Sequence, residues 1–522
     1  MKKDPIVCSS YYRNSFGSVD NGVTSWAEFG WSVAVNCDGS QVLVGSANDP
    51  SAVYMFNHRG EILRTFHNPL GSHATKHDDE LKSQFGFVVK MNVNGQRILI
   101  GDPAFGVVYL YDDRGHLIHT FVSPNSEVET KFGGALAISD DGSRIAIGAR
   151  HDEMDIPYEA VYLFYESIVQ SSGHTKPWIM ADPITSPHQG PDDHGGFGVS
   201  VALTPDGTKL LIGAWKERQL QGAAYLYNIV SVLGKHAHDS IPARDLVLAA
   251  EYFCGFASPN PAIAKGFGWA VDLTDQYAII GARMEMQNHE PDAGAVYIFS
   301  MQKEDEATGA ACNAAMDTIM QPLPVANKQF GAAVSIAGNR LLVASYSDGT
   351  AFWYESTITY VAAAQSNKTH FILRERIPVP TLLPTAPSTH GAAVALSRNG
   401  RVGVVGVPRA LGRGGHVATG AALGLCLPDP GTGTTTLDFT CPELDLYAVS
   451  WKDLRAFWFS WDSDSGKALA LIGTVILCLC ILFCRFKRRQ HRQRYLFQRL
   501  PTEPAQEHEM ELQVIQEFLV IS

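Results

Sequence analysis

The sequence predicts an all-β fold, a seven-bladed β-propeller, followed by a single transmembrane α-helix. A phrase that opens with Phe-Gly, or with His-Gly in its last copy, recurs along most of the chain. An Asp-Gly or Asn-Gly turn follows five of these starts at the same offset. An uncharged apolar stretch at 468–484 precedes a basic cluster. The starts of the phrase are Phe29, Phe85, Phe132, Phe197, Phe267, Phe330 and His390.

The second copy shows how one repeat is expected to fold. Short apolar runs at 87–91 and 97–100 flank Asn94-Gly95, a pair that accepts positive φ and favours a two-residue hairpin turn. A third run, VVYLY, follows, and the turn at 112–115 leads into a fourth run, HLIHTF. Each repeat is therefore predicted to form a four-stranded antiparallel meander.

Two glycines recur in phase, one after the opening Phe and one directly after the second apolar run, as at Gly86 and Gly101. We expect them near the hub, where neighbouring backbones approach closely and a side chain would clash. The last copy shows three strands without an obvious fourth. Residues 5–8 are predicted to supply that outer strand, which would bring Cys8 close enough to Cys426 for a disulfide.

The predicted boundaries divide the chain into five segments. They are an N-terminal segment with the ring-closing strand (1–28), the propeller (29–426), a juxtamembrane linker with an aromatic belt (427–467), the transmembrane helix (468–484) and a cytoplasmic tail (485–522).

Charge sets the expected orientation in the membrane. Basic residues from Arg485 onward place the tail in the cytoplasm by the positive-inside rule, and the propeller then lies at the cell surface or in a lumen. A buried core helix, or a tail anchor with a cytosolic propeller, are the alternatives. Because MKKDPIVCSS has no apolar core, a signal peptide is expected upstream of this sequence.

The composition also limits the kinds of partner that are expected. The net charge is −12 and there is no basic stripe, which argues against a nucleic-acid ligand. The sequon at Asn367 predicts N-glycosylation. An even number of cysteines outside the apolar stretch allows up to three disulfides. They are Cys8, Cys37, Cys254, Cys312, Cys426 and Cys441.

The repeated phrases resemble FG-GAP repeats, the units of the integrin α-chain propeller and of related extracellular proteins. The resemblance runs from about Phe29 to Gly406 and rests on the Phe-Gly, Asp-Gly and Val/Ile-Gly-Ala elements. Several integrin repeats carry a calcium loop of the D-x-D-x-D-G type. The corresponding loops here, such as CDGS and VNGQ, are too short and too poor in oxygen ligands to surround Ca²⁺. No cofactor is therefore expected.

Binding residues are expected on the second-to-third and fourth-to-first connections, which share one face of a propeller and are long in this chain. Trp215 and Arg218 are candidate interface anchors, because both residue types are enriched at hot spots; a Trp packed against a neighbouring blade is the alternative. A cation could bind at Asp152 and Asp155 or at Asp192 and Asp193, with a solvated acidic loop as the alternative. The candidates on this face are Asp49, Asp102, His151, Asp152, Glu153, Asp155, Trp215, Arg218, Glu285 and Asp292.

Motifs for catalysis are absent from the sequence. It contains no G-x-S-x-G elbow, no H-E-x-x-H and no P-loop, so the chain is not expected to be an enzyme. The expected function is non-enzymatic binding or adhesion at the cell surface, with a protein or glycan ligand. One alternative is a structural or assembly subunit that holds a membrane partner chain, as integrin α-chains do; another is a membrane-bound hydrolase.

Overall fold

The computed structural model divides the chain into two units, Met1–Pro442 and Glu443–Ser522. All the residues that the structure describes belong to the first unit. They are 13–16, 28–48, 51–71, 75–76, 81–125, 131–150, 159–167, 178–188, 195–233, 246–301, 312, 315–347, 350–361, 366–377, 393–408 and 421–427.

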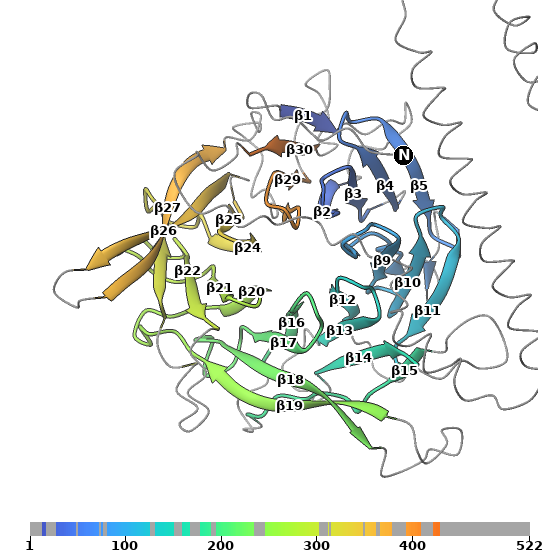
Figure 1. The fold of residues 1–522 in the computed structure, drawn as a ribbon, viewed down its shortest axis with the longest axis horizontal. Helices are drawn as coiled ribbons and strands as arrows, with labels where there is room; N and C mark the ends of the chain where they lie inside the picture. The colour runs from blue at the N-terminus through green and yellow to red at the C-terminus, as the bar shows by residue number, and fades with distance from the viewer. Residues whose placement is uncertain are drawn as a thin grey trace, which may run out of the picture. The chain divides into compact units, whose positions relative to one another are not determined.

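Seven four-stranded antiparallel sheets form the blades, so the predicted seven-bladed propeller is confirmed (Figure 1). Blade one contains β2 (Phe29–Val35), β3 (Gln41–Ser46), β4 (Ala52–Asn57) and β5 (Ile62–His67). Blade two contains β8 (Val88–Met91), β9 (Arg97–Asp102), β10 (Val107–Asp112) and β11 (Leu117–Val122). Blade three contains β12 (Lys131–Ile138), β13 (Arg144–Arg150), β14 (Ala160–Glu166) and β15 (Trp178–Met180).

The remaining blades follow the same plan. Blade four contains β16 (Phe197–Leu203), β17 (Lys209–Ala214), β18 (Ala223–Leu233) and β19 (Leu246–Phe256). Blade five contains β20 (Phe267–Leu273), β21 (Tyr277–Ala282), β22 (Ala295–Ser300) and β23 (Asp317–Met320). Blade six contains β24 (Phe330–Ala337), β25 (Arg340–Ser345), β26 (Ala351–Val361) and β27 (Ser366–Ile377). A separate two-stranded sheet joins β6 (Thr75–Lys76) to β7 (Leu81–Lys82).

Blade seven combines both ends of the propeller. Its order is β1 (Arg13–Phe16), β30 (Ala421–Cys426), β29 (Val402–Val407) and β28 (Ala393–Leu396). Within it, Asn14 lies opposite Gly424 in an antiparallel ladder. The N-terminal segment therefore supplies the outer strand at 13–16 rather than at the predicted 5–8. Residues 5–8 and the predicted Cys8–Cys426 bond lie outside the described residues.

The first hairpin of a blade is held by the side chain of its turn. In blade three the Asp141 carboxylate accepts the amide of Ser143 at 2.9 Å, and Gly142 between them has φ of 75°. Asp38 and Asp206 accept the equivalent amides in blades one and four at 2.9 Å each. These local bonds fix the register of the hairpin without help from the rest of the ring.

Glycines allow the blades to meet at the hub, as the sequence predicts. A Cβ added at Gly213 would lie well under 3.0 Å from the carbonyl oxygen of Gly268 in the next blade, a separation that real Cβ atoms do not show. One added at Gly406 would meet the carbonyl oxygen of Gly30 in the same way, where the ring closes. In blade six this position is occupied by Ala344. The glycines in this role are Gly45, Gly101, Gly148, Gly213, Gly281 and Gly406.

The opening Phe of each described repeat is buried in the blade interior. Its ring packs against a Tyr of the third strand, with centroids 5.6 Å apart for Phe85 and Tyr109 and 5.5 Å apart for Phe267 and Tyr297. Burying one such ring stabilises the fold by about 1.5–3 kcal/mol. The six residues, at most 1% exposed, are Phe29, Phe85, Phe132, Phe197, Phe267 and Phe330.

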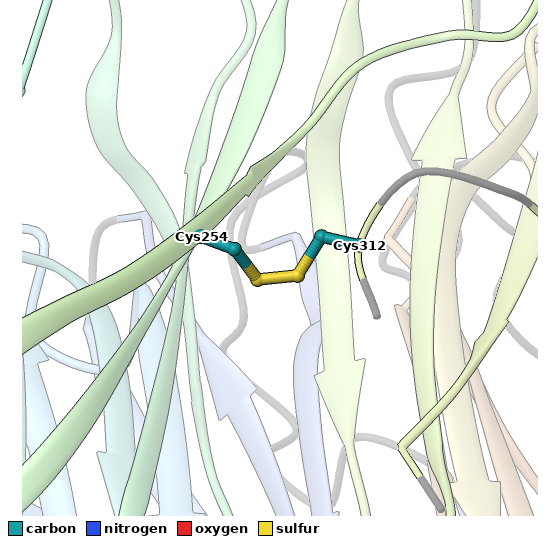
Figure 2. Close-up of a disulfide and its surroundings, with 2 residues drawn as sticks. All are labelled: Cys254 and Cys312. Atoms are coloured by element: carbon teal, nitrogen blue, oxygen red, sulfur yellow. A yellow bond between two sulfur atoms is a disulfide. The ribbon is translucent and has the colours of Figure 1, made fainter. Parts of the chain in front are cut away.

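A disulfide ties two neighbouring blades together (Figure 2). It joins Cys254 on β19 to Cys312, which lies between β22 and β23, over a sequence separation of 58 residues and a Cα–Cα distance of 6.2 Å. Cys37 is disulfide-bonded as well. The predicted transmembrane helix at 468–484 lies outside the described residues, and within those residues no helix is long and apolar enough to cross a membrane.

Candidate binding face

The start of each first strand and the end of each second strand lie at the same end of the blade. In blade five, Phe267 pairs with Ala282, and the ladder shifts register between Phe267 and Ala270. This bulge takes Gly268 and Trp269 out of regular pairing at the end of the innermost strand (Figure 1). We call this side of the propeller the loop face, because the second-to-third and fourth-to-first connections lie on it.

Four side chains gather at the hub end of the loop face. Trp215, Arg283 and Tyr346 each follow the second strand of blades four, five and six, so they occupy the same position of the repeat. Trp269 joins them from the bulge of blade five. We call these four residues the hub cluster; each of them is half-buried.

Arg283 lies at the centre of the hub cluster. Its guanidinium carbon is 3.2 Å from the ring centroid of Trp269, 5.2 Å from that of Tyr346 and 5.9 Å from that of Trp215. The two indole rings are 4.9 Å apart and meet at 75°. Stacking a cation on aromatic rings contributes about 0.5–2 kcal/mol, and more as the site loses water.

The surroundings of Arg283 partly disfavour its charge. Burial and the nearby charge of Arg150 together lower the pKa of Arg283 to about 10, although Tyr346 and Asp292 act in the opposite direction. The guanidinium remains protonated at neutral pH. Its Nε is buried and has no hydrogen-bond partner among the described residues. Burying a donor without a partner costs about 1–3 kcal/mol.

The predicted anchors and Asp292 have different surroundings. Trp215 belongs to the hub cluster and packs against Trp269 of the next blade, as the alternative interpretation expects. Its role as an interface anchor stays a prediction. Arg218 has its Nη2 2.9 Å from Nε2 of His188. Asp292 is half-buried and near enough to Arg283 to raise its pKa.

Two predicted ligand residues are in the interior instead. Asp102 is 0% exposed and accepts hydrogen bonds from Ser83 Oγ at 2.7 Å and from Asn68 Nδ2 at 3.1 Å. Glu285 is 1% exposed and accepts the hydroxyl of Tyr297 at 2.6 Å. Both carboxylates secure the start of a second-to-third connection, which accounts for their burial, and neither is presented to a ligand.

Other predicted positions fall outside the described residues. Asn367 lies on β27 opposite Tyr360, although its side chain is not described. Within the described part of the chain, no group of three or more His, Cys, Asp or Glu residues could hold a metal ion. The candidates without a described structure are Asp49, His151, Asp152, Glu153, Asp155, Asp192 and Asp193.

The sequence interpretation missed Trp269, Arg283 and Tyr346. A signal for the first was present, because an aromatic residue follows Phe-Gly in three repeats, at Trp31, Phe87 and Trp269. Trp31 and Phe87 also pack together, with centroids 5.3 Å apart. Aligning the copies on this position would have identified the aromatic residues near the hub.

Glu285→Gln should remove a pH dependence of stability. Burial raises the pKa of Glu285 from its ordinary value of 4.5 to about 7, so the folded state binds its proton more tightly than the unfolded state. The contribution of Glu285 to the free energy of unfolding is therefore greatest below pH 4.5. It falls by up to about 3 kcal/mol as the pH rises to 7. Melting temperatures at pH 5 and pH 8 should differ less in the variant. The exposed Glu251→Gln serves as control, and an unchanged pH dependence in Glu285→Gln would contradict the assignment.

A comparison with known families identifies one of the repeats. Residues 261–299 match the family model described as FG-GAP repeat. This segment contains β20 to β22 and with them Trp269 and Arg283. The chain is a β-propeller that carries an FG-GAP repeat. No curated protein sequence matches the chain significantly.

The solved structures that are similar to this chain have low sequence identity to it. A structure of U3-55K is 11% identical, with a TM-score of 0.45, over 80% of this chain and 98% of that one. The WD40 repeats of RRP9 are 10% identical, with a TM-score of 0.45, over 80% of this chain and 97% of that one. The β-propeller domain of Cps50 (Swd1) from Myceliophteria thermophila is 10% identical, with a TM-score of 0.47, over 80% of this chain and 100% of that one. None of these likenesses bears on function.

Proposed function

We propose that this protein is a non-enzymatic, integrin-α-like binding protein of the cell surface, anchored by the helix at 468–484, whose loop face binds a protein or glycan ligand. The hub cluster carries the proposal. It places half-buried Trp, Tyr and Arg side chains together on the face that bears the long connections. These residue types dominate binding energy at interfaces, and a rigid scaffold holds them at little entropic cost.

Disulfides support a location outside the cytoplasm. Cys254 and Cys312 are bonded to each other, and Cys37 is also bonded. Such bonds form and persist in secreted and lumenal compartments and are rare in the cytosol. The basic residues behind the apolar stretch favour the same orientation.

Antibody labelling of cells that express the full chain tests the topology. We expect an antibody against the propeller to bind intact cells, and one against the tail at 485–522 to bind only after permeabilisation. Labelling of the propeller only after full permeabilisation would place it in a lumen. Labelling after selective opening of the plasma membrane would place the propeller in the cytosol and overturn the proposal.

An assembly subunit is the second candidate, favoured by the long hairpin of blade six. Strands β26 and β27 have 11 and 12 residues, and the hairpin extends beyond the rest of its blade in Figure 1. Ile358 on this hairpin is 71% exposed and Ile372 is 44% exposed. Purification of the full chain in mild detergent separates the two functions. A stoichiometric partner chain retained without added ligand would favour the assembly role over adhesion.

A further inference from the structure

The second-to-third connection of blade five, residues 283–294, is closed at its base by Glu285. The backbone carbonyl of Glu285 accepts the amide of Gly294 at 2.9 Å, and its carboxylate Oε1 accepts the hydroxyl of Tyr297 at 2.6 Å. These bonds join the start of the connection to its end and to the third strand, so they must break when the connection opens. Opening then takes the Glu285 carboxylate from the interior into water.

Three residues of this connection have a left-handed backbone that residues other than glycine rarely adopt. They are Asn288, His289 and Asp292, with φ of 49°, 69° and 52°. Backbone in this region is strained and persists only where the surrounding bonds hold it. The closed connection therefore depends on its anchoring bonds, and those of Glu285 are the buried ones at its base.

One oxygen of the Glu285 carboxylate lacks a hydrogen-bond donor. Oε2 is buried and has no hydrogen-bond partner among the described residues. The Ser258 hydroxyl lies close enough to affect the pKa of Glu285, but it has a single proton and donates it to the Tyr297 hydroxyl at 3.2 Å. Burying a charged oxygen without a donor is costly, and a proton removes the charge. The site therefore favours the neutral form of Glu285.

Blade four contains the same arrangement with the missing donor supplied. Glu217, which is also 1% exposed, accepts the Tyr225 hydroxyl at Oε2 and the Ser186 hydroxyl at Oε1, the latter at 2.5 Å. The next residue, Arg218, lies near enough to lower the pKa of Tyr225, whereas a Met follows the buried Glu of blade five. Donors at both oxygens and a nearby cation favour a charged carboxylate. The two equivalent connections therefore differ in the protonation state that their buried Glu favours.

Other titratable groups around Glu285 do not determine its charge. Burial and the nearby Glu285 raise the pKa of Tyr297, so the phenol stays neutral at physiological pH. Among the described residues, no charged group is a cause of the shift in the pKa of Glu285. The charged residues of this connection and of the two connections bonded to it, 257–266 and 321–329, are Arg283, Glu290, Asp292, Lys265 and Lys328.

We propose that the blade-five connection is a pH-sensitive element of the loop face, closed while Glu285 carries a proton and open when Glu285 is charged. Because the carboxyl is buried only in the closed state, that state binds the proton more tightly than the open one. Closure is therefore strongest at acidic pH, and it weakens as the pH rises from the ordinary Glu pKa of 4.5 to about 7. This inference goes beyond the proposed function and does not depend on the ligand.

Hydrogen exchange of the full chain in detergent, followed by mass spectrometry at pH 5 and pH 8, tests the inference without a ligand. Exchange rates are divided by the intrinsic rate at each pH, so that the remaining difference reports opening of the structure. We expect protection of peptides that cover 283–294 to fall about tenfold or more between pH 5 and pH 8. Peptides that cover the blade-four connection, 215–222, should change much less. Constant protection of 283–294, or an equal fall in both connections, would overturn the inference.

Two variants identify the group that titrates. Glu285→Gln keeps the shape of the neutral side chain and cannot become charged, so protection of 283–294 should be the same at both pH values. His289 is exposed and is the other side chain of this connection whose type changes charge between pH 5 and pH 8. His289→Asn, which tolerates the left-handed backbone, should keep the fall in protection. A fall that persists in folded Glu285→Gln, or that disappears in His289→Asn, contradicts the role of Glu285.

Discussion

Gly213→Ala is expected to destabilise the propeller by about 1–3 kcal/mol or more. The added Cβ would clash with the carbonyl oxygen of Gly268, which belongs to the backbone of the next blade and cannot rotate away. Relief therefore requires blades four and five to separate. The melting temperature of the full chain, followed by circular dichroism of the strands, measures the effect.

A second glycine in the same blade provides the control. A Cβ at Gly255, on the outer strand β19, would meet the ring of Tyr225 at 3.3 Å, where a small shift is sufficient. Gly255→Ala should therefore lower the melting temperature less than Gly213→Ala does. Ala344 already occupies the hub position in blade six, so tolerance of alanine there is expected. Equal melting temperatures for the two glycine variants would show that the blades do not depend on close approach at Gly213.

Removal of the disulfide between Cys254 and Cys312 should have an effect of similar or larger size. Because the bond closes a loop over a separation of 58 residues, loop entropy gives a loss of about 4 kcal/mol when both cysteines are replaced by alanine. The double variant Cys254→Ala/Cys312→Ala leaves no free thiol at the site. Its melting temperature should fall below that of wild type under oxidising conditions.

Reductant provides the internal check for the disulfide. Wild type should lose stability when reductant is added, whereas the double variant should lose only what Cys37 and any other bonded cysteines contribute. Mass mapping of non-reduced peptides should recover Cys254 and Cys312 together. Free thiols at both positions would contradict the bond, and an unchanged melting temperature in the double variant would contradict its contribution.

Much of the fold could be predicted because its determinants are local and recur in phase. The Asp141 turn bonds to an amide two residues away, and Phe267 packs on a Tyr in its own blade. The hub glycines make contacts between blades, but their regular spacing made them visible. The outer strand at 13–16 carries no such repeated sequence signal. Its partner β30 lies at the opposite end of the propeller in the sequence.

The candidate site was less predictable because it depends on contacts between repeats. Trp215, Arg283 and Tyr346 come from three consecutive blades, and only the packing of these blades against each other brings them together. The burial of a side chain could not be inferred from its position in a connection either. Glu285 lies beside Met286, which is 38% exposed, yet Glu285 itself is 1% exposed because Tyr297 holds it inside.

Completion of blade seven by β1 has a consequence for biosynthesis. The ribosome makes residues 13–16 before the other strands of the propeller, but their partner strand ends at Cys426. During translation the N-terminal segment must therefore wait unpaired while the blades form behind it, and an incomplete chain exposes an open strand edge. Synthesis of β30 therefore sets the earliest time at which this edge can be covered.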